Sequence, residues 1–173
     1  MKRIKIRKGR HYPGLFPFSI PCPVWVKRNK IYSRSAEFMF TDSCMFDLYD
    51  EDQWDVNKLF GFSIGHHHKG SSFRFGWRPI LDENLIEIVA YEYHDGFRMR
   101  TQPIRKVRLN EWHKFRVSYN NENFKATYLV NDLDYTYPVY LMDDHGWGYT
   151  LGVYFGGNEK APQDIIINKR KLK

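Results

Sequence analysis

Apolar and polar residues alternate along much of the chain, as they do in strands that bury one face. Between residues 30 and 40 the aromatic residues and an alanine fall on one face, with Arg34 among them, and polar residues on the other. Asp95-Gly96, a strong hairpin turn signal, separates predicted strands at 84–94 and 97–101. No segment shows an apolar repeat of 3.6 residues, so the pattern predicts β structure with under about 10% helix.

Prolines mark the predicted edges of the sheets, because a proline cannot donate a hydrogen bond to a central ladder. Residues 15–26 contain Pro17, Pro21 and Pro23 and are predicted to form an extended edge segment. Pro138 predicts a second edge strand. The remaining predicted strands are residues 2–8, 44–48, 59–64, 72–77, 105–109, 112–119, 124–130, 135–141, 149–155 and 164–168.

The length of 173 residues suits one domain, and the 17% aromatic content favours half-buried strands over helices. Cys22 and Cys44 are too few for a disulfide framework and too far apart for a metal knuckle. We expect two reduced core thiols, with a single disulfide as the alternative.

The segment 146–168 carries a resemblance to a known family. A predicted strand ends on Phe-Gly-Gly-Asn, an Ala-Pro step follows, and a β-branched strand closes the segment. The residues concerned are Tyr154, Phe155, Gly156, Gly157, Asn158, Ala161, Pro162, Asp164 and Ile165. This segment resembles the end of a concanavalin A-like lectin/glucanase domain. The resemblance implies that residues 1–173 form one all-β domain, a two-sheet antiparallel β-sandwich of the jelly-roll type.

Positive charge is concentrated at the two ends of the chain. Of the 27 basic residues, ten lie in residues 1–10 and 169–173, and the rest of the chain carries 17 basic against 20 acidic residues. Either the ends bind an acidic partner, such as another protein subunit, or they protect edge strands from aggregation. Because the body is not basic, we do not expect nucleic acid as a partner. The candidate partner-binding residues are Lys2, Arg3, Lys5, Arg7, Lys169 and Arg170.

Acidic residues do not form the catalytic pattern of the glucanases that share this fold, which aim alternating carboxylates of one strand into a cleft. Glu87 and Glu92 are five residues apart and therefore face opposite sides of a regular strand. We predict no catalytic residues. An enzyme remains the alternative, as a glycan hydrolase or a lyase that uses a Tyr-His pair such as Tyr91 or Tyr93 with His94 or His145.

A candidate glycan site lies at residues 143–148. Lectins of this fold bind sugars with a carboxylate, an amide or backbone glycine, and an aromatic ring. Asp143, Asp144, His145 and Trp147 supply such groups, with Trp147 between two glycines. Trp147 could instead cover the end of the core. The paired metal motif of legume lectins is not evident, so we expect a metal-independent site and no cofactor.

A glycine-flanked loop contains His66, His67 and His68, of which His66 and His68 would share one face in extended backbone. Such a pair could bind metal, but no third ligand stands at the required spacing. We therefore predict a polar or glycan-facing loop, with metal binding as the alternative.

The sequence thus predicts a non-catalytic, lectin-like module that recognises a carbohydrate. The alternative from a different class is a structural protein of an assembly, such as a phage virion decoration component, in which the domain forms oligomers. Residues 1–10 are basic but are followed by prolines rather than an apolar run, so we expect no signal peptide, no membrane segment and synthesis in the cytoplasm.

Overall fold

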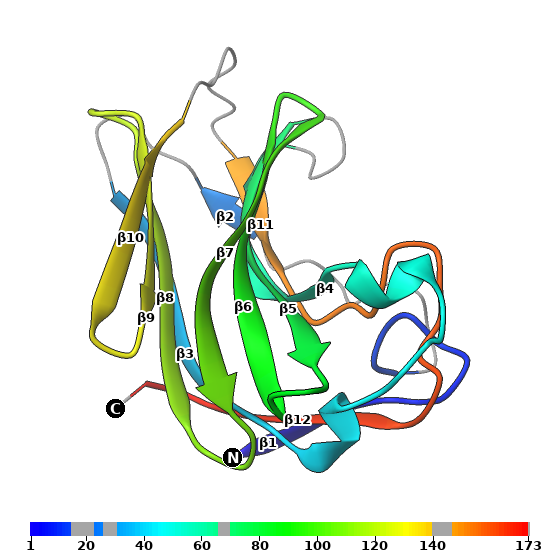
Figure 1. Cartoon of the computed structure of the whole chain (residues 1–173). Coiled ribbons are helices and arrows are strands. Elements are labelled where there is room, and N and C mark those ends of the chain that lie inside the picture. Colours follow the sequence, from blue (N-terminus) through cyan, green and yellow to red (C-terminus); the bar gives the residue numbers. More distant parts are fainter. Residues whose placement is uncertain (15–22, 26–30, 66–69, 140–146, 173) are drawn as a thin grey trace.

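Two six-stranded antiparallel sheets pack face to face in the computed structural model, which describes residues 1–14, 23–25, 31–65, 70–139 and 147–172. The order is β1-β12-β3-β8-β9-β10 in the first sheet, called sheet A here, and β2-β11-β4-β5-β6-β7 in sheet B. Figure 1 shows β10, β9, β8 and β3 beside β7, β6, β5 and β4. The predicted two-sheet sandwich is therefore confirmed.

The strands are β1 (Lys2–Ile6), β2 (Pro23–Trp25), β3 (Ile31–Phe40), β4 (Asn57–Ile64), β5 (Ser71–Ile80), β6 (Leu85–His94), β7 (Phe97–Arg108), β8 (His113–Asn120), β9 (Lys125–Val130), β10 (Leu133–Pro138), β11 (Trp147–Leu151) and β12 (Ile165–Arg170). The helical residues of the described chain form two 3-10 turns, η1 (Asp42–Cys44) and η2 (Glu51–Trp54). The prediction of a strand at 44–48 was wrong, because η1 occupies its start and the chain continues without strand pairing.

Turn and edge residues act as their chemistry predicts. Asp95 and Gly96 adopt φ of 49° and 85°, the left-handed geometry of a tight hairpin turn, between β6 and β7. Strands β1, β10, β2 and β7 form the four sheet edges, and three of them contain a proline. The edge positions predicted for the segment that contains Pro23 and for Pro138 are confirmed, and β1 is an edge strand as well.

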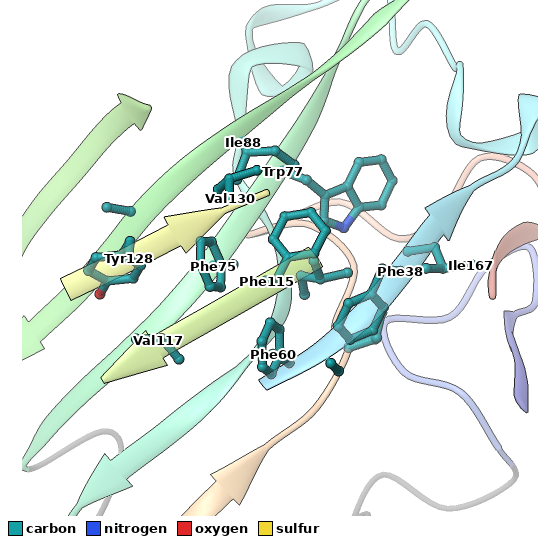
Figure 2. Packing of buried hydrophobic residues seen from close by; sticks show 14 of the residues in the cluster. Phe38, Phe60, Phe75, Trp77, Ile88, Phe115, Val117, Tyr128, Val130 and Ile167 are labelled. Atoms are coloured by element: carbon teal, nitrogen blue, oxygen red, sulfur yellow. The ribbon is translucent and has the colours of Figure 1, made fainter. Parts of the chain in front are cut away.

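The core between the sheets is dominated by aromatic rings (Figure 2). Phe115 lies at its centre, with ring centroids 5.1 Å from Phe75, 5.8 Å from Phe38 and 6.5 Å from both Phe40 and Phe60. The predicted face of β3 supplies several of these rings. Tilted and edge-on pairs at such distances add to the stability gained by burial of apolar area.

Cys44 is a buried, unbridged cysteine, and burial raises the pKa of its thiol to about 12. The thiol expected there is confirmed, whereas Cys22 lies outside the described residues. In the described parts of the chain, no helix has both the length and the apolar character needed to span a bilayer.

Candidate functional site

The outer face of sheet B, the face turned away from the core, carries a cluster of basic and tyrosine side chains. Cross-strand partners share a face, and the register aligns Gly61 of β4 with Arg74 of β5 and Arg74 with Tyr91 of β6. Lys58 of β4 lies on the same outer face as Arg74 and Tyr91 because the pairing of β4 with β5 shifts by one residue between Lys58 and Phe60. Leu59 and Phe60 both face the core at this bulge, which leaves Lys58 on the outside.

Lys58 is half-buried and is held by backbone groups. Its Nζ donates a hydrogen bond of 2.9 Å to the carbonyl oxygen of Gly156 and lies 5.1 Å from the ring centroid of Tyr91 and 5.8 Å from that of Tyr154. Burial, followed by the charge of Arg74, lowers the pKa of Lys58 from 10.5 to about 8. An appreciable fraction of this amine is therefore neutral at mildly alkaline pH.

Arg74 is the second cation of the cluster. Burial lowers the pKa of its guanidinium to about 10, an effect opposed by Tyr91, Tyr93 and Tyr154. Its Nε is buried and has no hydrogen-bond partner among the described residues. Within the same described ranges, no carboxylate forms an ion pair with Arg74 or Lys58.

Two tyrosines of β6 complete the cluster. The hydroxyl oxygens of Tyr91 and Tyr93 are 3.5 Å apart, and Tyr93 is the more exposed of the two. Burial raises the pKa of Tyr91 to about 12, with a further rise from Tyr93 and an opposing effect of Arg98. Tyr91 is therefore a protonated hydroxyl, and thus a hydrogen-bond donor, throughout the neutral range.

The segment after β11 closes one side of the cluster. Tyr154 pairs with Lys58 through two backbone hydrogen bonds of 2.8 and 2.9 Å. His11 stacks on the Tyr154 ring at 5.1 Å with an interplanar angle of 9°. The amide of Gly156, at φ 68°, donates to Oδ1 of buried Asn57 at 2.6 Å, which anchors the residue whose carbonyl accepts the hydrogen bond from Lys58 Nζ. In Figure 1 this orange segment and the dark blue loop after β1 lie on the same side of the molecule.

Trp147 belongs to the same face of sheet B as the cluster. Leu151 pairs with Gly61, and Trp147 lies four residues before Leu151 on β11, so both share the face of Arg74. Its side chain is 42% exposed and contacts the Tyr149 ring at a centroid distance of 5.5 Å. The expected exposure is present, although Trp147 begins a strand and was predicted in a loop. Asp143, Asp144, His145, His66 and His68 lie outside the described residues.

The acids of β6 lie on opposite faces, as predicted. Glu87 on the outer face pairs with Arg78 at 2.6 Å, whereas Glu92 is buried on the core side and pairs with Arg100 at 2.9 Å. His94 is also buried there, 3.2 Å from Glu92. The suggested pairing of His94 with Tyr91 or Tyr93 was therefore wrong, because His94 alternates to the other face of the strand.

The two basic ends of the chain meet. β1 pairs with β12 so that Lys2 aligns with Lys169 and Arg3 with Asn168. Alternation then divides the predicted partner-binding residues between the faces of sheet A. Arg3, Lys5 and Arg170 point outward, and Lys2 and Lys169 point inward, where Lys169 Nζ lies 5.5 Å from the Phe38 ring. Arg7 follows the end of β1.

Acidic residues also gather around η2. Asp52, Asp55 and Glu159 contribute to the lining of a shallow, open depression of the surface. The pKa of Asp52 is raised, first by desolvation and then by the charges of Asp55 and Asp50. No group of three or more His, Cys, Asp or Glu in the described ranges is arranged to hold a metal ion.

The sequence alone did not identify Lys58, Arg74 or Tyr154 as site residues. The signal available was a pair of arginines four residues apart, and therefore on one face, within the mostly apolar strand 71–80. Tyr91 and Tyr93 are two residues apart and likewise share a face. The cross-strand register that unites these residues is visible only in the structure.

Comparison with known proteins gives structural likeness only. No protein-family model matches the sequence, and no curated protein matches it. Alginate lyase vAL-1 from Chlorella virus is similar over 98% of this chain and 81% of its own, with 11% identity and a TM-score of 0.63. An alginate lyase from Pseudomonas aeruginosa is similar over 84% and 66%, with 10% identity and a TM-score of 0.54. The concanavalin A-like resemblance read from residues 146–168 is thereby confirmed at the level of the fold.

Proposed function

We propose that this protein binds an acidic polysaccharide on the outer face of sheet B and cleaves it by β-elimination. The observation that carries the proposal is the half-buried pair of cations, Lys58 and Arg74, surrounded by tyrosines and without a carboxylate partner among the described residues. Transferring a cation from water to such a place is unfavourable unless an anion compensates. A carboxylate of the ligand would compensate both charges.

A uronic acid residue fits the arrangement. Its carboxylate would receive hydrogen bonds from the Arg74 guanidinium, whose Nε lacks a partner in the described chain. Neutralising this carboxylate makes the adjacent C5-H more acidic. Polymers of uronic acids include alginate, and the two alginate lyases that share the fold agree with this ligand class.

The elimination needs one base and one acid. Neutral Lys58 would take the C5 proton, because its pKa of about 8 leaves part of it unprotonated near neutral pH. The C5-H electrons form the C4=C5 double bond as the C4-O4 bond breaks. Tyr93 would protonate the departing O4, supported by the Tyr91 hydroxyl 3.5 Å away. One chain becomes two, one of which ends in an unsaturated uronate, and no other reactant is required.

Trp147 extends this surface towards β11. An exposed indole beside Tyr149 offers an apolar platform for the face of a sugar ring. We include Trp147 in the ligand site, with Asp143, Asp144 and His145 as hydrogen-bonding neighbours and His66 and His68 at a glycan-facing loop. The lectin-like function predicted from the sequence thus becomes the binding step of a lyase.

The test measures cleavage and binding separately on uronate polymers. Cleavage is followed by the ultraviolet absorbance of the unsaturated product, and binding by calorimetry. We expect Arg74→Gln to lose both, and Tyr93→Phe to lose cleavage while it retains binding. Arg78→Gln is the matched control, since Arg78 lies on the same strand and face but is already paired with Glu87.

Two results would contradict the proposal in different ways. If the wild-type protein binds uronate polymers through Arg74 but forms no unsaturated product, the protein is a non-catalytic lectin. If Arg74→Gln binds as well as the wild type, the cluster is not the ligand site.

A further inference from the structure

The outer face of sheet A carries a second concentration of positive charge. Five basic residues lie on it by strand register, on β1, β12 and β8, and we call them the basic face: Arg3, Lys5, Lys114, Arg116 and Arg170. Since the two outer faces of a sandwich look in opposite directions, the basic face is separate from the Lys58 cluster.

Only part of this charge is neutralised within the described chain. Lys5 pairs with Asp164 at 2.6 Å, and Arg170 pairs with Glu37. Among the described residues, Arg3, Lys114 and Arg116 are exposed and form no ion pair. The basic face therefore keeps three uncompensated cations, although the body of the chain has more acidic than basic residues.

The spacing of these cations suits an extended ligand. Arg3 on β1 and Arg116 on β8 are three strands apart in sheet A, about 14 Å across the sheet at the usual strand separation, and the register offsets them by four further residues along the strands. Between and around them lie short hydroxyl side chains, including Ser33, Ser35 and Ser118, which keep the surface open to hydrogen bonding. A single small anion could not reach all three charges, whereas a polyanion could.

We propose that the basic face is a second contact surface for the acidic polysaccharide, which holds one segment of the polymer while another occupies the outer face of sheet B. This inference rests on the proposed function for the identity of the polymer. Two contacts with one polymer raise the overall affinity, because the second binding event becomes intramolecular. Of the basic ends predicted from the sequence to meet an acidic partner, Arg3 would thus contribute an uncompensated charge to substrate capture.

The experiment compares binding to long uronate polymers and cleavage of short uronate oligomers. In the triple variant Arg3→Gln, Lys114→Gln and Arg116→Gln, we expect polymer affinity at low salt to fall about tenfold, from three exposed charge contacts. The dependence on salt should also become weaker. Cleavage of oligomers, which are too short to reach the basic face, should stay at the wild-type rate.

A matched control removes the same charge elsewhere. Lys8, Arg108 and Lys160 are exposed and lie outside the basic face, so their triple Gln variant should bind polymer within about twofold of wild type. Polymer binding that is unchanged in the first variant, or equally weakened in the control, would overturn the proposal. An affinity of the basic face for duplex DNA more than tenfold higher than for a uronate polymer would also overturn it.

The outcomes separate this inference from the proposed function. If the wild-type protein forms no unsaturated product, or if Arg74→Gln binds as well as the wild type, the proposed function fails, while the loss of polymer affinity in the basic-face variant can still be measured. If the basic face is not a contact surface, Arg74→Gln will still lose oligomer cleavage, but the triple variant at Arg3, Lys114 and Arg116 will bind the polymer with wild-type affinity.

Discussion

Replacing Lys58 by Met should make the protein more stable while it abolishes cleavage. The pKa of Lys58 is lowered from 10.5 to about 8 in the folded protein, chiefly by burial, so the cationic form is better solvated in the unfolded chain. A difference of about 2.5 in pKa corresponds to about 3.4 kcal/mol of unfolding free energy. Methionine has a similar length and carries no charge that must be buried.

The expected gain is smaller than this figure for two reasons. The variant loses the hydrogen bond from Nζ to the Gly156 carbonyl, worth about 1 kcal/mol. Lys58 is only half-buried, so water already relieves part of its desolvation. We therefore expect Lys58→Met to raise the free energy of unfolding at about pH 7 by about 1–3 kcal/mol, measured by urea denaturation.

The pH dependence of this gain identifies its cause. Between about pH 8 and pH 10.5 the unfolded wild-type chain binds more protons at Lys58 than the folded protein does, so wild-type stability rises with pH in this window. Other groups titrate alike in both proteins and cancel in the difference. The advantage of Lys58→Met should therefore be complete below about pH 8 and gone above about pH 10.5.

Lys160→Met is the matched control, since Lys160 is exposed, and it should show no gain at any pH. The reasoning would be refuted if Lys58→Met were no more stable than wild type at about pH 7, or if its advantage were the same at both ends of the window.

Three further substitutions test the core, the turn and the ligand surface. Phe115→Ala should lower the free energy of unfolding by about 3–5 kcal/mol in urea denaturation, because this buried ring contacts four others. Gly96→Ala should cost about 1–3 kcal/mol in the same measurement, because a side chain at φ 85° is strained. Trp147→Ala should remain folded, since the ring is 42% exposed, and should lose about 1–3 kcal/mol of glycan binding by calorimetry. Marked unfolding of Trp147→Ala would show that this ring is a core residue.

The architecture was predictable because local signals determine it. Alternation identifies the buried face of β3, Asp95-Gly96 specifies a tight turn, and Pro138 marks an edge strand. Each of these signals acts within about ten residues of the chain. The strand predicted at 44–48 failed because Cys44 ends the turn η1 and the apolar residues after it pack on the core without pairing to a strand.

The candidate site was less predictable because it depends on contacts between distant segments. Lys58 lies on the outer face through a bulge, one residue before the predicted strand 59–64. Arg74 meets Tyr91 through the register of β5 and β6, which no local pattern specifies. The two strands predicted within 146–168 belong to different sheets, and Tyr154, which was predicted within the first of them, follows β11 and pairs with Lys58 instead.

The position of charge carries more information about function than its amount. The ten basic residues at the ends determine the sign of the net charge, yet those that the structure describes are mostly exposed and solvated, so they cost the fold little. Lys58 and Arg74 contribute two charges of 27, but the fold places both among tyrosines, where burial opposes ionisation. Backbone groups alone do not neutralise them: the Gly156 carbonyl accepts one hydrogen bond from Lys58, and Arg74 Nε has no acceptor in the described chain. A ligand carboxylate would therefore be attracted most strongly to the outer face of sheet B, although the sequence concentrates its basic residues at the two ends.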